Sequence, residues 1–121
     1  MMGKILILLS MVFCHIVDDY YLQGWLASAK QKEWWNKNAP DELYKYEYIV
    51  ALFMHSFSWT FMVMLIPTLI TGIFYPFFFV ANVLTHMYVD NLKANKKMIN
   101  LVEDQSMHMI QIFCTWYTYM F

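Results

Sequence analysis

Four histidines are spread along the chain, one to each of four apolar segments: His15, His55, His86 and His108. Three of them have an aspartate four residues away, in the pairs His15–Asp19, His86–Asp90 and Asp104–His108. Residues four apart lie on the same face of an α-helix, so each pair directs an imidazole and a carboxylate the same way. Neutral imidazoles and carboxylates are ligands for divalent ions such as Zn²⁺, Mn²⁺ or Fe²⁺. The spacing therefore indicates one shared polar site with metal-binding chemistry.

Roles within this site can be assigned by residue type. The predicted metal ligands are His15, Asp19, His86, Asp90, Asp104 and His108. His55 is expected to be either a further ligand or a general base. Gln23 and Gln111 are expected to hydrogen-bond to the ligands, and Lys93 to contact a substrate. A bound ion would offset the carboxylate charge and acidify a water molecule. The simpler interpretation is that each pair only joins helices by a hydrogen bond.

The composition is that of a membrane protein. In 121 residues, 60% are hydrophobic and only 14% are charged, whereas apolar residues make up about 45–50% of soluble globular proteins. A chain of this length forms at most one domain. Because the net charge is −1, no nucleic-acid partner is expected; the bilayer itself is the expected environment.

The apolar segments predict an all-α protein, a four-helix transmembrane bundle with a polar His/Asp interior. The expected spans are residues 4–26, 41–66, 71–92 and 98–121. Between the first two lies a loop or short interfacial helix, because tryptophans alternate there with lysines, as is typical of the headgroup layer. Pro40 and the acidic residues after it predict the start of the second span, and Pro67 predicts its end.

The last segment has an unusually polar face. Its polar residues recur at spacings of four, three, four and three: Asp104, His108, Gln111, Thr115 and Thr118. This periodicity places them on one side of a helix, which favours a span whose polar side faces the bundle. The alternative is a helix lying flat on the membrane. Such helices usually carry basic residues on the polar face, and residues 98–121 contain none.

The lysines predict the orientation. Seven of the eight flank the first and third connections: Lys30, Lys32, Lys37, Lys45, Lys93, Lys96 and Lys97. By the positive-inside rule this side is cytoplasmic, which indicates a multi-pass protein of the inner membrane. With 1.5 Å of rise per residue, all predicted ligands and His55 lie within roughly 15 Å of that side. We therefore expect the site in the cytoplasmic half of the bilayer.

The stretch from His15 to Gln23, followed by Lys30 and Lys32, resembles the opening of a family of uncharacterised small membrane proteins, domain-of-unknown-function family 3307. That opening reads approximately H-x-x-x-D-[FY]-x-L-Q. Later positions are similar to the family's remaining signature: His55, His86-x-x-x-Asp90-x-x-Lys93 and Asp104-Gln105-x-x-His108. The resemblance implies a membrane protein of a bacterium or a phage. The chain is also distantly similar to membrane-bound metal-dependent hydrolases with histidine-rich helices.

Three functions remain open. The first is a metal-dependent hydrolase acting on a lipid or a phosphorylated compound. The second is a non-enzymatic phage or bacterial protein that binds a membrane partner and uses the polar core only for structure. The third is proton or ion movement along the His/Asp groups, for which four short spans would need a homo-oligomer.

Overall fold

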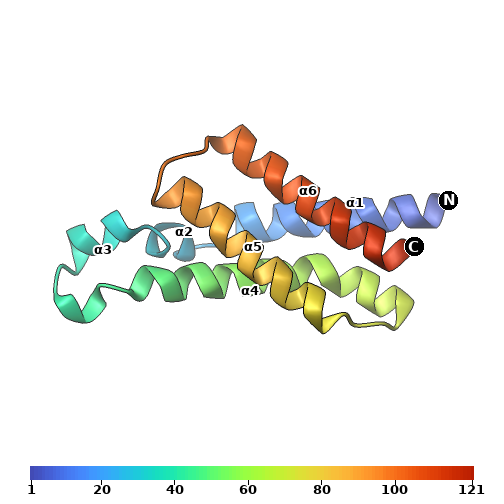
Figure 1. The fold of residues 1–121 in the computed structure, drawn as a ribbon, viewed down its shortest axis with the longest axis horizontal. Helices are drawn as coiled ribbons and strands as arrows, with labels where there is room; N and C mark the ends of the chain where they lie inside the picture. The colour runs from blue at the N-terminus through green and yellow to red at the C-terminus, as the bar shows by residue number, and fades with distance from the viewer.

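The computed structural model describes residues 1–121 and contains helices but no strand, which confirms the all-α prediction. The elements are α1 (Met2–Ile16), a π-helical continuation η1 (Val17–Leu22), α2 (Leu26–Ala29), α3 (Lys32–Asn38), a 3-10 turn η2 (Glu42–Tyr44), α4 (Glu47–Thr71), α5 (Pro76–Ala94) and α6 (Leu101–Met120). The four long helices α1, α4, α5 and α6 form a bundle (Figure 1). The short helices α2 and α3 extend beyond one end of it.

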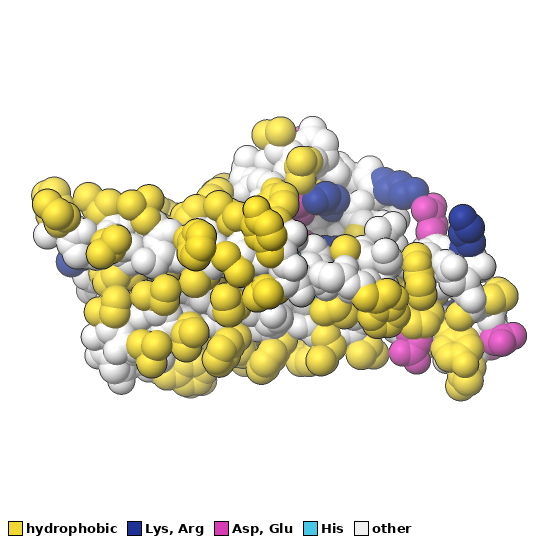
Figure 2. Space-filling model, turned by 180° about the vertical axis from the view of Figure 1, so that it is seen from behind, with side chains coloured by type: hydrophobic (Ala, Val, Ile, Leu, Met, Phe, Trp, Pro, Cys, Tyr) yellow, Lys and Arg dark blue, Asp and Glu magenta, His cyan; other side chains and the backbone are white.

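Neighbouring helices in the bundle run in opposite directions. α1 and α5 run toward the end that carries α2 and α3, and α4 and α6 run back toward the end that holds both termini (Figure 1). The short connections between α4 and α5 and between α5 and α6 favour this antiparallel arrangement. Figure 2 shows charged side chains gathered toward the α2–α3 end of the visible face, while hydrophobic side chains cover most of the rest.

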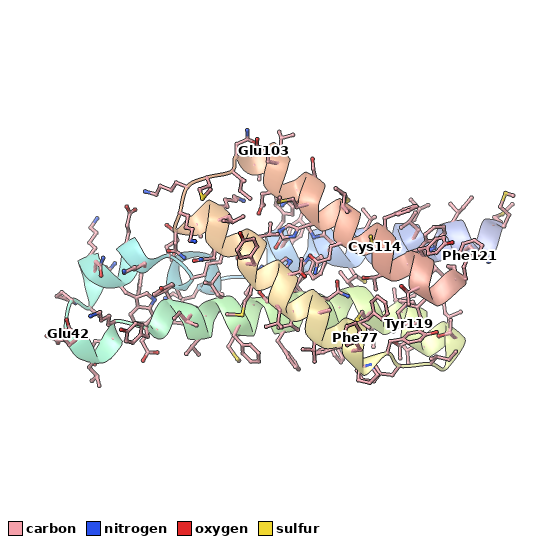
Figure 3. The ribbon with its side chains drawn as sticks, in the orientation of Figure 1. Glu42, Phe77, Glu103, Cys114, Tyr119 and Phe121 are labelled. Carbon is pink, nitrogen blue, oxygen red and sulfur yellow. The ribbon has the colours of Figure 1, made fainter.

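An apolar core fills the half of the bundle nearer the termini. Its fully packed members come from α1, α4 and α6: Ile7, Met11, Trp59, Val63 and Ile112. The opposite sides of the same helices remain apolar although they are exposed, as at Leu6, Leu9 and Phe61. Figure 3 shows Phe77, Tyr119 and Phe121 toward this end and Glu42 at the other.

Two segments are long and apolar enough to cross a membrane, Met2–Leu22 and Glu42–Thr71. They correspond to the first and second predicted spans. The other two long helices do not reach the same mean hydropathy, because each carries a stripe of buried polar residues. In α5 the stripe contains His86 and Asp90, and in α6 it contains Asp104 and His108.

The second span departs from its predicted limits. The predicted stop at Pro67 is wrong, because α4 continues to Thr71 and ends at Gly72, whose φ of 68° is left-handed. Pro67 has no N–H to offer the Val63 carbonyl, yet the helix continues past it. In its last turn, Thr71 Oγ1 donates to the Pro67 carbonyl oxygen at 2.8 Å. The start also differs, because residues 42–44 form a 3-10 turn and the α-helix begins at Glu47.

The remaining boundaries follow local signals. α5 begins at Pro76, since proline suits the first helical position, rather than at residue 71. α6 begins after Asn100, whose side chain accepts from the Glu103 backbone N–H at 3.0 Å, while the Glu103 carboxylate accepts from the Asn100 N–H at 2.8 Å. The predicted interfacial segment contains two short helices, α2 and α3.

Candidate metal centre

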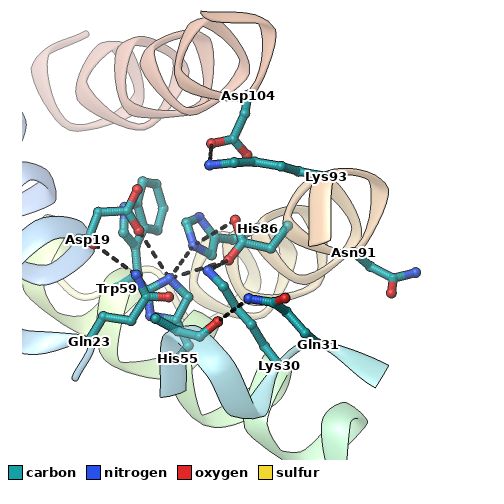
Figure 4. A network of polar contacts seen from close by, with 12 residues as sticks. Asp19, Gln23, Lys30, Gln31, His55, Trp59, His86, Asn91, Lys93 and Asp104 are labelled. Carbon is teal, nitrogen blue, oxygen red and sulfur yellow. Dashed lines mark hydrogen bonds and ion pairs between the residues drawn. The ribbon is translucent and has the colours of Figure 1, made fainter. Parts of the chain in front are cut away.

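Five predicted polar side chains from different elements meet inside the bundle. They are Asp19 from η1, His55 from α4, His86 and Asp90 from α5, and His108 from α6. Figure 4 shows Asp19, His55 and His86 of this set turned toward one another. The five side chains are between 0% and 9% exposed. Because ionisable groups this deep need partners, the side-chain contacts decide what the cluster can do.

The Nε2 atoms of the three histidines converge on the two carboxylates. His55 Nε2 lies 3.0 Å from Asp19 Oδ1 and 3.2 Å from His86 Nε2. His108 Nε2 and His86 Nε2 lie 3.2 and 3.7 Å from Asp90 Oδ1, and His55 Nε2 lies 3.4 Å from Asp90 Oδ2. The five side chains thus surround one small volume.

These separations suit a divalent metal ion. Ligand atoms placed tetrahedrally at about 2.0–2.1 Å from zinc lie about 3.3 Å from one another. Two ligand groups are present, Asp19–His55–His86 and His86–Asp90–His108, and within each group the ligand atoms lie within 4.8 Å of one another. Because both groups share His86 Nε2, the geometry fits one ion held by members of both groups.

A stack of three rings orients two of the imidazoles. The indole of Trp59 lies on His86 with 4.2 Å between centroids and 22° between planes, and His86 lies on His108 at 4.2 Å and 26°. Two imidazolium cations at this distance would repel each other, so the stack disfavours charge on both rings at once. Neutral imidazole is the form that binds metal.

The buried charges are unbalanced. Four carboxylates are buried at or beside the cluster: Asp18, Asp19, Asp90 and Asp104. Two ammonium groups reach them, with Lys30 Nζ 2.7 Å from Asp90 Oδ2 and Lys93 Nζ 3.0 Å from Asp104 Oδ2. In the metal-binding state, with neutral imidazoles and ionised carboxylates, the four carboxylates and two ammonium groups would leave two negative charges, which one divalent cation would balance.

The family model described as "Protein of unknown function (DUF3307)" matches residues 6–121, a stretch that includes the whole cluster. The chain belongs to the DUF3307 family. The comparisons with curated proteins and with solved structures found no match. The family has no assigned activity, so the function of this DUF3307 chain is argued from its geometry.

Two predicted ligands lie beside the ligand groups of the DUF3307 chain rather than within them. His15 Nδ1 accepts from Trp59 Nε1 at 2.7 Å, so its Nε2 carries the hydrogen and donates to Gln105 Oε1 at 2.9 Å. Asp104 Oδ2 accepts from Lys93 and from Gln105 Nε2, both at 3.0 Å, and Asp104 Oδ1 lies 3.4 Å from His108 Nε2. Both residues border the cluster and connect it to neighbouring helices.

The two glutamines predicted to hydrogen-bond to the ligands, Gln23 and Gln111, lie in different polar groups. Gln23 Nε2 donates to the backbone carbonyl of Asp19 at 2.8 Å, which places it at the edge of the cluster. Gln111 instead donates to the backbone and side-chain oxygens of Asn82 at 2.8 and 2.9 Å. It therefore belongs to another buried polar group, which also includes Thr115.

Three side chains contribute to the site beyond those that the sequence predicts. Lys30 is predicted only as part of the lysine-rich flank, and Gln105 bridges Asp19 and Asp104 through its Nε2 at 3.2 and 3.0 Å. The third is Asp18. Because successive α-helical residues diverge by about 100°, the sequence predicts that Asp18 points away from Asp19, either at the solvent edge or as a helper.

The solvent-edge interpretation of Asp18 is wrong. Its side chain is 1% exposed, accepts from Ser58 Oγ at 2.6 Å, and lies 3.7 Å from His55 Nδ1. The cause is the π-helical turn η1, which changes the direction of both aspartates. No signal in the sequence marks that turn.

Proposed function

We propose that this DUF3307 chain is an integral membrane metalloprotein that holds a divalent ion, Zn²⁺, Mn²⁺ or Fe²⁺, inside a four-helix bundle. The ligands are Asp19, His55, His86, Asp90 and His108. The observation that carries the proposal is the spacing of 3.0–3.7 Å among their converging Nε2 and carboxylate atoms. The presence of four buried carboxylates against two ammonium groups is consistent with it.

A bilayer location for all four long helices is supported by the side each helix buries. In α5 the polar residues Asn82, His86 and Asp90 are buried, whereas Phe77 and Leu84 are exposed. A helix whose ionisable groups face the bundle interior can cross lipid even though its mean hydropathy is modest. The lysine-bearing end would then face the cytoplasm, by the positive-inside rule.

The chemistry proposed for this centre is hydrolysis. A divalent ion in such a site supplies an acidified water as nucleophile. In the proposed site, His55 serves as a ligand rather than as a base, because its Nε2 faces the other ligands. Asp104 Oδ1 receives no hydrogen bond and is buried at the edge of the cluster, where it could accept a proton from that water.

The metal content of detergent-purified protein tests the proposal. Elemental analysis is expected to find stoichiometric divalent metal in the wild type and to lose it in His86→Ala, because His86 belongs to both ligand groups. Lys96→Gln, a change at an exposed lysine, is the matched control and should keep the ion. Full metal content in a folded His86→Ala variant would contradict the proposal.

Proton transfer is the second candidate, and one contact favours it. His55 Nε2 and His86 Nε2 are 3.2 Å apart, so a single proton can be shared between the two rings, as in His/Asp relays of membrane proteins. Metal-free wild-type protein that conducts protons in liposomes, and loses conductance in His55→Ala, would support this function over the first. It would also require a homo-oligomer with a continuous path.

A further inference from the structure

A polar cavity of about 370 Å³ opens directly beside the cluster, between α2 and the end of α5. Its volume falls in the range of small-molecule sites, about 300–1,000 Å³. Asp90 lines it and is at the same time a member of the ligand group His86–Asp90–His108. A molecule in this cavity therefore lies next to the proposed ion.

The cavity is lined by hydrogen-bond donors from two sides. From the α2 side come Gln23, Lys30 and Gln31, and from the α5 side come Lys93 and Lys97. Figure 4 shows Lys30 extended between Gln23 and Gln31 toward the cluster. Three ammonium groups around one space are donors of the kind that bind the oxygens of a phosphate group. The Lys97 ammonium is paired with the exposed Glu33 carboxylate at 2.9 Å, and the two amides donate to backbone carbonyls.

The turn after α5 places Lys97 on the α5 side of the cavity. Lys97 has a φ of 53°, a left-handed conformation that is uncommon for a residue with a side chain. The hydrogen bonds from Lys96 N to Asn91 O at 3.1 Å and from Met98 N to Leu92 O at 2.9 Å hold the turn. A left-handed residue held by such bonds is a common way for a helix to end, and here it fixes the course of the chain at Lys97.

The acidic partners of two lysines belong to the cluster or border it. Lys30 Nζ bonds to Asp90 Oδ2 at 2.7 Å, and Lys93 Nζ bonds to Asp104 Oδ2 at 3.0 Å. A divalent ion bound by Asp90 competes for the same carboxylate charge. The Lys30 ammonium then has charge available for another anion, so binding of metal and anion should reinforce each other.

We infer that this cavity binds the phosphate group of a phosphorylated molecule, held by Lys30, Lys93 and Lys97 beside the metal centre. The inference rests on the proposed function and names its substrate class. The phosphate belongs either to a lipid headgroup or to a soluble compound; in both cases the phosphoester lies next to Asp90. Hydrolysis would break the phosphorus–oxygen bond, with water supplying the hydroxyl group and the departing oxygen taking up a proton.

Binding of inorganic phosphate to metal-loaded protein in detergent micelles, measured by calorimetry, tests the inference. Lys93→Gln and Lys97→Gln are each expected to weaken binding about tenfold or more, as for the loss of one charge-assisted hydrogen bond. Lys96→Gln removes the same charge from the same loop outside the cavity and should bind as the wild type does. An equal loss in all three variants, or none in Lys97→Gln, would overturn the inference.

Two further measurements show where the phosphate group comes from and which of the two proposals fails if binding is not as expected. The same variants are assayed in nanodiscs that contain phosphatidic acid in place of phosphatidylcholine. If the lipid phosphate competes with inorganic phosphate for binding, the phosphate group belongs to a lipid headgroup. If it does not compete, the phosphate group belongs to a soluble compound. Metal content is recorded for every sample. If the wild-type protein contains no stoichiometric metal, the proposed function is contradicted. If the metal is present but phosphate binding does not depend on the lysines, only this inference is contradicted.

Discussion

Two consecutive aspartates hold the His55 imidazole at opposite nitrogens. Asp19 Oδ1 is 3.0 Å from Nε2, and Asp18 Oδ2 is 3.7 Å from Nδ1. When Nε2 binds an ion, the hydrogen resides on Nδ1 and faces Asp18. At 3.7 Å the pair is beyond hydrogen-bond distance, and neither atom has another hydrogen-bond partner. If the two atoms closed to hydrogen-bond distance around a bound ion, Asp18 would fix the tautomer of His55 and raise its basicity as a ligand.

Replacing Asp18 tests this role. Asp18→Asn is expected to lower metal affinity about 10- to 100-fold, the usual effect of losing such a partner, while a saturating metal concentration still gives full occupancy. Competition with a chromophoric chelator measures the affinity. Glu42→Gln removes an exposed carboxylate at the far end of the molecule and should change nothing. An unchanged affinity in Asp18→Asn would show that Asp18 serves only packing.

Trp59 has a second role besides stacking, because its Nε1 donates to His15 Nδ1. Trp59→Phe keeps a ring beside His86 but leaves the buried His15 nitrogen unpaired. We expect a loss of about 1–3 kcal/mol in the free energy of unfolding, measured by denaturation in mixed micelles. Trp34→Phe is the control, since Trp34 is half-buried in α3 and its indole has no hydrogen bond. Equal stability of Trp59→Phe and the wild type would contradict the assigned bond.

At the scale of residues, the sequence predicts the His/Asp pairs within one helix but not the side-chain contacts between helices. The spacing of His86 and Asp90, which a single helix dictates, correctly places Nε2 within 3.7 Å of Oδ1. The bridge through Gln105 and the pairing of Lys30 with Asp90 depend on how separate elements rotate and dock. No periodicity within one segment encodes that rotation.

At the scale of elements, helix existence was predictable and helix limits were less so. The polar stripe of α6 correctly indicates which side faces inward, because the same 3.6-residue period governs burial. Pro67 misleads, since a proline inside a helix removes one backbone hydrogen bond without necessarily ending the helix. The stop signal of α4 lies at Gly72, where the chain adopts a left-handed conformation.

Replacing Gly72 with alanine tests whether this glycine ends α4. Gly72→Ala is expected to destabilise the protein by about 1–2 kcal/mol, the cost of a left-handed conformation for a residue with a Cβ, although no atom lies within 4 Å of the new methyl group. Gly3→Ala also meets open space, but it lies inside α1 and should be neutral or stabilising by up to about 1 kcal/mol. Thermal unfolding in detergent compares them; equal effects would contradict the left-handed cap.

For the whole molecule, the direction of the helices makes a topological prediction. Both termini lie at the end opposite α2 and α3 (Figure 1), so the two ends of the bundle should face different compartments. In a chain without Cys14 and Cys114, Gly3→Cys is expected to react with a membrane-impermeant maleimide on intact cells. Asn38→Cys and Asn100→Cys should react only after lysis. The reverse pattern would contradict the positive-inside orientation.

The same assay examines whether α6 crosses the bilayer. Cysteines at Asn100 and Phe121 flank this helix. If α6 spans, they react from opposite sides, because its 20 residues extend about 30 Å. Labelling of both positions from one side would show that the helix lies along the surface, with His108 brought to the cluster from there.

Because Trp59 contacts His86, the intrinsic fluorescence of the protein can report on metal binding. Of the five tryptophans, Trp59 is the one that stacks on a ligand-group imidazole, with ring centroids 4.2 Å apart. Replacing the other four would leave a single emitter whose fluorescence responds to the electronic state of that ring. A paramagnetic ion such as Mn²⁺ would quench it, so occupancy could be titrated in intact micelles without radioactivity or chelators.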